Sequence, residues 1–238
     1  MAMQTREQHI RRDRATSNIC TAQALLANMA AFYGVWHGPK GLTNIAERVN
    51  HMTHILHDSL SEMGYSVKTD KNRCFDTIAI DVSGESKGAK GVLEAFESEG
   101  MNLGVIDENT INVSLNETVT LAELEKLVEV FGKVKGKTHR VNFENSAYQG
   151  IDSELRRKSK FMTHEIFNSV NSETDMLRYI QKLADKDVGL TKSMIPLGSC
   201  TMKLNATVEM IPVSWPEFSQ IHPFAPQNQT EGYKQMIN

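Results

Sequence analysis

A short segment with two hydroxyls, a thiol and a lysine is the part of this chain best suited to chemistry. It runs from Ser193 to Asn205 and reads S-M-I-P-L-G-S-C-T-M-K-L-N. Pro196 and Gly198 stand two residues apart, which disfavours a regular helix. Three consecutive polar residues, Ser199 to Thr201, would each need a polar partner inside a packed strand. The pattern therefore predicts a loop, and loops on a rigid scaffold often carry binding and catalysis.

The side chains of this loop favour recognition of an anion over nucleophilic catalysis. The hydroxyls of Ser199 and Thr201 can donate hydrogen bonds to a carboxylate or phosphate oxygen. Lys203 could add positive charge, although a solvated lysine fits the pattern equally well. Cys200 could serve as a nucleophile, but the sequence shows no base close to it. The alternative to a binding site is an ordered crossing loop.

Three histidines form a second candidate group. His51, His54 and His57 are spaced by three residues on a predicted helix. Neighbouring members of such a series come within reach of each other, but successive steps drift around the helix. The spacing therefore favours a polar helix edge over a metal site, and we predict no metal centre.

Composition limits the class of protein. The chain has 238 residues, 40% of them apolar, and a formal net charge of −3. These values indicate a folded core and no general attraction to nucleic acid or anionic membranes. No run of about 18 apolar residues predicts a membrane span, and the first residues lack the apolar core of a secretion signal. The three cysteines lie far apart and suggest a reducing compartment. They are Cys20, Cys74 and Cys200.

The chain reads as four successive domains or segments. Residues 1–63 are predicted to be helical, with a helix over 19–33 that is apolar nearly all round and should be buried on several sides. A turn at 38–41 separates it from an amphipathic helix ending near Met63. Residues 64–131 are predicted to form a small α+β domain. Residues 132–160 read as a linker, and residues 161–238 as a loop-rich lead-in to a further domain.

The α+β domain is predicted from changes in periodicity. Alternation over 78–82 indicates a strand, and 103–106 with 111–115 indicate two more. Apolar positions at helical spacing predict helices over 89–96 and after Thr120, which forms a capping box with Glu123. The order strand, helix, two strands, helix favours an antiparallel sheet with helices packed on one face.

The linker and the C-terminal part show no long stretch of hydrophobic periodicity. Residues 132–160 carry eight cationic and three acidic side chains. We interpret this excess as a solvated linker in preference to a nucleic-acid patch, because few aromatic residues are interleaved. Ser172 and Asp175 should open another helix. After Asp187 the chain is expected to run as loops, because five of the six prolines fall there.

Four stretches together carry a resemblance to a known family. They are residues 4–28, 163–183, 193–205 and 221–233, which begin Q-T-R-E-Q-H-I-R-R-D-R, T-H-E-I-F-N-S-V-N-S-E, S-M-I-P-L-G-S-C-T-M-K and I-H-P-F-A-P-Q-N-Q-T-E. In this order they closely resemble the P-protein, or glycine decarboxylase, family of the glycine cleavage system. Its members are much longer and have two similar halves, of which only the C-terminal one is active. The resemblance makes this chain a central fragment.

The resemblance implies a fold, a cofactor and partners. The fold would be part of a fold-type-I, aminotransferase-like enzyme (α+β and α/β) that uses pyridoxal phosphate. Glycine would be decarboxylated, and its aminomethyl group passed to a lipoyl carrier protein, the H-protein. Other implied partners are the rest of the polypeptide or a second subunit, in a dimer of two-half units. The location would be the mitochondrial matrix in a eukaryote and the cytoplasm in a bacterium.

The resemblance also places candidate site residues near the cofactor or substrate. They are Ser199, Cys200, Thr201, Lys203, Asn205 and His222. In the family the cofactor lysine follows a histidine, and none of the eight histidines here precedes a lysine. We therefore expect no catalytic residue in this chain and no activity from it alone. The alternative is a non-catalytic scaffold or partner-binding fragment.

Overall fold

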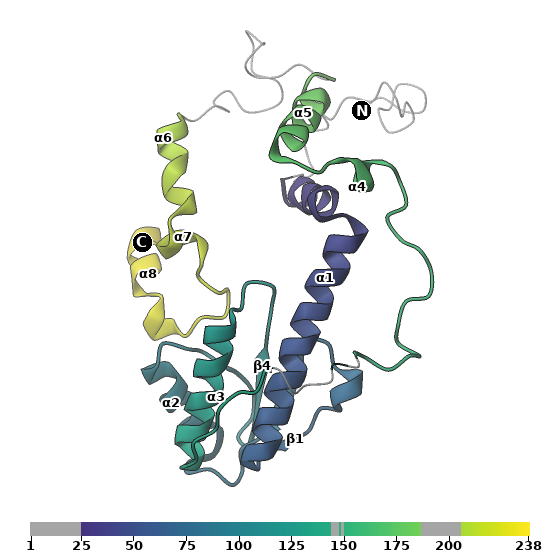
Figure 1. Ribbon diagram of the computed structural model, residues 1–238. Helices are drawn as coiled ribbons and strands as arrows, with labels where there is room; N and C mark the ends of the chain where they lie inside the picture. The colour runs from purple at the N-terminus through teal and green to yellow at the C-terminus, as the bar shows by residue number, and fades with distance from the viewer. Residues whose placement is uncertain (1–24, 144–147, 149, 187–205) are drawn as a thin grey trace, which may run out of the picture. The chain divides into compact units, whose positions relative to one another are not determined.

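The computed structural model describes residues 25–143, 148, 150–186 and 206–238 (Figure 1). The chain divides into two compact units. Unit 1 combines residues 1–36 with residues 165–238, and unit 2 comprises residues 37–164.

Helix α1, Leu25–Met63, is interrupted where the sequence predicts a turn. Gly38 has φ 59° and ψ −178°, which is not helical, and Pro39 follows it. A positive φ is readily adopted only by glycine, and proline cannot donate the helical hydrogen bond. These two residues kink the helix next to the boundary between the two units.

The first part of α1 is more exposed than its composition predicts. Leu25 and Leu26 are 70% and 77% exposed, and Met29 is also exposed. The expectation that this helix is buried on several sides is wrong for its described residues. An apolar helix face is buried only where another element covers it. Within unit 1 the ring of Phe32 meets the ring of Tyr179 edge-on, with centroids 6.2 Å apart.

Unit 2 is built around a four-stranded antiparallel sheet. The strand order is β1-β2-β4-β3, and each neighbouring pair is antiparallel. The predicted strands and helices are confirmed, and the two-residue β1 is an addition. The strands are β1 Ser66–Val67, β2 Thr77–Asp81, β3 Gly104–Asp107 and β4 Thr110–Ser114; the helices are α2 Gly88–Ser98 and α3 Leu121–Lys135, with a 3-10 turn, η4, at Lys71–Arg73.

The core of unit 2 lies between the sheet and three helices. Alternate residues of β2, Ile78 and Ile80, are fully buried and belong to this core. The rings of Tyr65 and Phe96 pack edge-on against Phe131, at centroid distances of 5.3 and 4.7 Å. The Tyr65 hydroxyl donates to the Phe131 carbonyl over 2.9 Å. Phe131 is thus the point at which α3 contacts both α2 and the residue Tyr65 just after α1.

A partly buried ion pair borders this aromatic cluster. The ammonium of Lys135 lies 4.5 Å from the centre of the Tyr65 ring and 2.5 Å from a carboxylate oxygen of Glu85. Burial and the charge of Glu85 raise the pKa of the Tyr65 hydroxyl, which stays protonated as a hydrogen-bond donor.

The predicted capping box begins α3. The Thr120 hydroxyl accepts from the Glu123 amide at 3.2 Å, and the Thr120 amide donates to the Glu123 carboxylate at 2.7 Å. These bonds satisfy two backbone donors that a bare helix end leaves unpaired.

Replacing Thr120 with alanine is expected to lower the free energy of unfolding of unit 2 by about 1 kcal/mol, because it removes the cap. Thr120→Ser keeps the hydroxyl and should remain close to the parent chain. Urea unfolding of the three proteins, followed by circular dichroism, measures the difference. Equal loss in the serine and alanine variants would refute the capping role.

The segment after α3 packs against the rest of unit 2, although its sequence is typical of a solvated linker. The ammonium of Lys137 donates to the Met63 carbonyl at 2.7 Å, and Val141 belongs to the core. The Asp152 amide donates to the Asn72 carbonyl at 2.9 Å. These contacts are made by isolated residues that do not recur at helical or strand spacing. Hydrophobic periodicity therefore does not predict them. The division of the chain into four domains stays a prediction.

Unit 1 contains short helices in its C-terminal part. Ser172 caps α5 as predicted, accepting from the Asp175 amide at 3.1 Å. Where loops were expected after residue 205, the chain forms helical turns instead. Two of them have a proline in the first turn, Pro212 and Pro216, a position that suits proline. The elements are α4 Ile166–Ser169, α5 Glu173–Ala184, α6 Thr207–Met210, η5 Ile211–Ser214, α7 Pro216–Ser219, η6 Gln227–Gln229 and α8 Glu231–Ile237.

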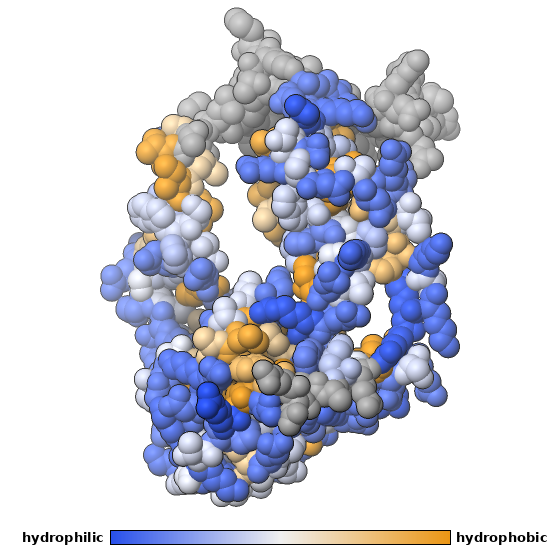
Figure 2. Space-filling view, in the orientation of Figure 1, coloured by the Kyte–Doolittle hydropathy of each residue, from blue (hydrophilic) through white to orange (hydrophobic). Residues whose placement is uncertain are grey.

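Apolar side chains are exposed over α6 and η5 (Figure 2). They include Val208, Met210, Ile211 and Val213. None of the helices in the described ranges is long and apolar enough to cross a membrane.

Candidate functional site

Most of the predicted site residues cannot be placed. Ser199, Cys200, Thr201, Lys203 and Asn205 lie outside the described residues. Their proximity to a cofactor or substrate stays a prediction. His222 is the one predicted site residue with a described position.

His222 lies in an exposed turn of unit 1. The Phe224 amide donates to its Nδ1 atom over 3.1 Å, and the two rings are 5.9 Å apart. Because Nδ1 accepts, the neutral ring carries its proton on Nε2. The backbone therefore fixes this imidazole in one tautomer and leaves Nε2 as the donor.

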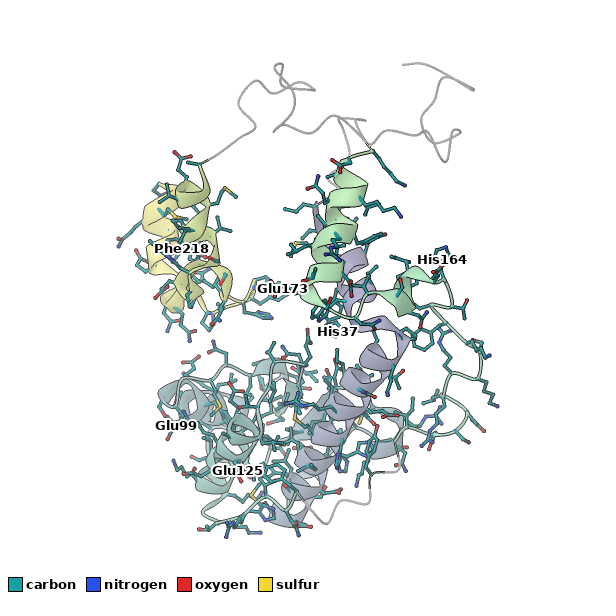
Figure 3. All side chains as sticks on the ribbon, turned by 45° about the horizontal axis from the view of Figure 1, so that its top comes forward. His37, Glu99, Glu125, His164, Glu173 and Phe218 are labelled. Atoms are coloured by element: carbon teal, nitrogen blue, oxygen red, sulfur yellow. The ribbon has the colours of Figure 1, made fainter. Side chains whose placement is uncertain are left out.

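An aromatic cluster supports the same region. The ring of Phe218 lies 6.3 Å from Trp215 and 6.2 Å from Tyr233, and the Tyr233 hydroxyl donates to the Phe218 carbonyl at 2.7 Å. Figure 3 labels Phe218 among these short helices. The hydrogen bond ties α8 to α7 across the turn that holds His222.

The three histidines of α1 do not form the polar edge that their spacing predicts. His54 is only 2% exposed and belongs to the interior. Its ring meets Tyr148 edge-on at 5.6 Å, and the His51 ring lies 4.9 Å from the same tyrosine. His57 Nε2 lies 3.3 Å from the Thr69 carbonyl. In the described ranges, no three His, Cys, Asp or Glu side chains are grouped to hold a metal ion.

The surroundings of His54 hold it neutral. Burial lowers the pKa of its imidazole, the positive charge of Lys71 lowers it further, and the carboxylate of Asp58 opposes both. Lys71 and Asp58 are themselves an ion pair, with nitrogen and oxygen 2.5 Å apart. The Nε2 atom of His54 is buried and finds no hydrogen-bond partner among the described residues.

We expect acid to destabilise unit 2 through His54. A pKa below the ordinary 6.5 means that the unfolded chain binds more protons than the folded one. The free energy of unfolding should therefore fall as the pH drops below about 6.5, by at most about 1.4 kcal/mol per pH unit. Urea unfolding between about pH 7.5 and 5 measures this slope.

His54→Phe removes the titrating group, keeps a ring against Tyr148 and should flatten the slope. His164→Gln, at an exposed histidine, is the matched control and should leave the slope as in the parent. An unchanged slope in His54→Phe would assign the acid sensitivity to another group.

A groove of about 610 Å³ lies between α1 and the described residues 148 and 150–161, here called the return segment. Its volume falls within the roughly 300–1,000 Å³ of ligand pockets. One face of α1 forms a wall with Leu42 and Glu47, and Phe75 contributes from the loop before β2. The return segment contributes Arg156 and other residues.

The side chain of Asn50 holds the walls of the groove together. Its side chain is buried; the amide nitrogen donates to the carbonyls of Cys74 and Phe75 at 3.0 and 2.8 Å. Its amide oxygen accepts from the Tyr148 hydroxyl at 3.1 Å. One asparagine thus joins all three walls. The interpretation of residues 132–160 as a linker did not predict this groove; the available signal was the cationic run R-R-K-S-K at 156–160.

Comparison with known proteins gives consistent matches. The family model described as "Glycine cleavage system P-protein" matches residues 1–131. A "Glycine dehydrogenase (decarboxylating)" of Deinococcus radiodurans is 52% identical over 238 residues, which are 100% of this chain and 24% of that protein. The mitochondrial "Glycine dehydrogenase (decarboxylating) 1" of Arabidopsis thaliana is 51% identical over 240 residues, covering 100% of this chain and 22% of that protein.

A solved structure is also similar. It is described as a crystal structure of glycine decarboxylase (P-protein) of the glycine cleavage system in inhibitor-bound form, with 32% sequence identity and a TM-score of 0.43. The match covers 56% of this chain and 31% of that one. The chain spans about a quarter of the length of the curated relatives it matches. By its family model and its relatives, this chain belongs to the glycine cleavage system P-protein family.

Proposed function

We propose that this chain is a central part of a glycine decarboxylase of the glycine cleavage system. The whole protein would decarboxylate glycine and transfer the aminomethyl group to a lipoyl carrier protein. The observation that carries the proposal is identity of about half the residues, over the entire chain, to proteins named glycine dehydrogenase (decarboxylating). The same observation favours an enzyme segment over a non-catalytic scaffold.

The proposed cofactor is pyridoxal phosphate, but the residues at hand do not fit it by themselves. The cofactor needs a lysine for its imine, and none of the eight histidines precedes a lysine as in the family's motif. His222, the one described candidate, is exposed and bonded to its own turn. We infer that the cofactor lysine is supplied outside these 238 residues.

The proposal extends to assembly and location. The rest of the polypeptide, or a second subunit, would complete the enzyme, in a dimer of two-half units. The lipoyl carrier protein would be a transient partner. Mitochondrial and bacterial relatives support the mitochondrial matrix in a eukaryote and the cytoplasm in a bacterium.

A chimaera tests the proposal. In the Deinococcus radiodurans relative, the segment matching this chain is replaced by all 238 residues. If the segments share one role, glycine-dependent exchange of CO₂ should stay within about tenfold of the parent, a cost of about 1.4 kcal/mol. The isolated 238-residue chain should show neither exchange nor the visible absorbance of a bound pyridoxal imine.

The control is the same relative with that segment deleted, which sets the background. A chimaera that folds, assembles like the parent and binds the cofactor but exchanges no CO₂ would argue against a shared role. Borohydride trapping of the cofactor on one specific lysine of the isolated chain would contradict the assignment of the lysine to another part of the protein.

A further inference from the structure

The groove between α1 and the return segment has one cationic wall. Residues 152–160 hold four cationic and two acidic side chains, and all four cations are exposed. Two of them, Arg156 and Arg157, line the groove. The facing wall on α1 has one carboxylate, Glu47. Its neighbour Arg48 donates instead to the carbonyls of Glu117 and Val119, at 3.1 and 2.6 Å.

Both arginines are held by the return segment itself. Arg156 Nε donates to the Ile151 carbonyl at 2.8 Å, and Arg157 Nη1 donates to the Ser159 hydroxyl at 3.2 Å. The Arg157 guanidinium also lies 5.4 Å from the centre of the Phe161 ring. A guanidinium has five N–H donors, so Arg157 keeps donors for a carboxylate. An arginine that is already positioned loses less side-chain freedom on binding.

The remaining lining is mainly apolar. Phe75 is 49% exposed, and Leu42 and Phe161 are partly buried in the same groove. Exposed aromatic side chains beside arginine are typical of protein interfaces, where they receive a large side chain of the partner. The groove thus offers an apolar surface along one side and positive charge along the other.

We propose that this groove is a docking site for an acidic peptide segment of a partner protein that carries a large apolar side chain. The carboxylates bind Arg156 and Arg157, and the apolar side chain lies against Phe75 and Leu42. Charge complementarity selects this occupant. Glu47 on the facing wall repels a ligand that carries a negative charge on every unit, which disfavours nucleic acid relative to a peptide whose carboxylates alternate with uncharged residues.

Fluorescence anisotropy of the full 238-residue chain with labelled peptides tests the proposal at low salt. The probe is an extended dodecapeptide of alternating Glu and Ser with one central Phe. The comparison probes replace Glu by Lys, replace Phe by Ser, or are a twelve-nucleotide oligo-dT. We expect binding of the acidic Phe peptide, weaker binding without Phe, and weakening of both as salt rises.

Two variants with one matched control locate the site. Arg157→Gln and Phe75→Ala should each weaken binding of the acidic Phe peptide by about tenfold. Arg178→Gln, an exposed arginine of α5 in unit 1, should leave binding unchanged. Circular dichroism melting confirms that each variant is folded; if Phe75→Ala is not, Arg157→Gln decides alone, since its side chain is exposed.

Three results of these binding experiments would contradict the docking proposal. No binding of the acidic Phe peptide, or equal weakening in Arg178→Gln, would overturn the proposal. Oligo-dT that binds more tightly than the peptide and is weakened by Arg157→Gln would replace it with a nucleic-acid site. These outcomes do not depend on glycine turnover, so they are independent of the proposed function.

Discussion

Phe131→Ala is expected to lower the free energy of unfolding of unit 2 by about 3–5 kcal/mol, as large aromatic truncations in packed cores do. Phe131 is fully buried and contacts Tyr65 and Phe96 at once. The alanine leaves a cavity where α1, α2 and α3 meet, and it removes two edge-to-face ring contacts. Tyr65 cannot move into the space easily, because its hydroxyl is bonded to the residue 131 carbonyl.

Hydrogen exchange of the β2 and β4 amides, read by mass spectrometry, is the suitable measurement. Both tryptophans, Trp36 and Trp215, lie in unit 1, so tryptophan fluorescence does not report on unit 2. Leu121→Ala is the matched control, because Leu121 begins the same helix and is 50% exposed. Leu121→Ala should lower the free energy of unfolding by less than about 0.5 kcal/mol. Similar protection of the two strands in both variants would show that the ring cluster does not hold unit 2 together.

Strand β2 and helices α2 and α3 of unit 2 could be predicted because each one buries a single face. Such a face gives alternation in a strand and a three-to-four-residue spacing in a helix. The alternation at Ile78 and Ile80 and the Thr120–Glu123 capping box both recur in the structure. The kink at Gly38 could also be predicted from the sequence, because glycine and proline change the allowed backbone conformations directly.

Features that depend on single contacts could not be predicted. Strand β1 has two residues, too few to show a period. His54 is buried, and its ring packs against Tyr148, nearly a hundred residues later in the chain. The groove requires Asn50 to bond three distant backbone and side-chain groups. Such pairings are long-range and leave no local pattern.

The candidate site is a different case. Its chemistry was read from residue types and from the family resemblance, and five of its six residues lie outside the described ranges. Family membership supports the enzyme class but assigns no role to an individual hydroxyl. Ser199 and Thr201 therefore have to be tested in a complete protein, and the chimaera with the Deinococcus radiodurans relative offers one.

In that chimaera, Ser199→Ala combined with Thr201→Val is expected to lower kcat/KM for glycine by about ten-fold to a hundred-fold. We propose that these hydroxyls, beside Gly198, donate hydrogen bonds to a charged oxygen of the substrate or cofactor. Such a bond is worth roughly 1.5–3 kcal/mol, and about 1.4 kcal/mol corresponds to a ten-fold change. Both substitutions remove a hydroxyl at nearly constant volume, so packing should change little.

Cys200→Ser is the matched control between the two sites. It should have a milder effect if the thiol only packs, because the replacement has nearly the same size. Glycine-dependent CO₂ exchange and thermal unfolding are measured on the same samples, which separates a binding role from a structural one. Normal exchange in the double variant would remove this loop from the site. A large fall in melting temperature with a proportionate loss of exchange would instead assign the two hydroxyls to folding, because a hydrogen bond that holds the loop acts on stability first.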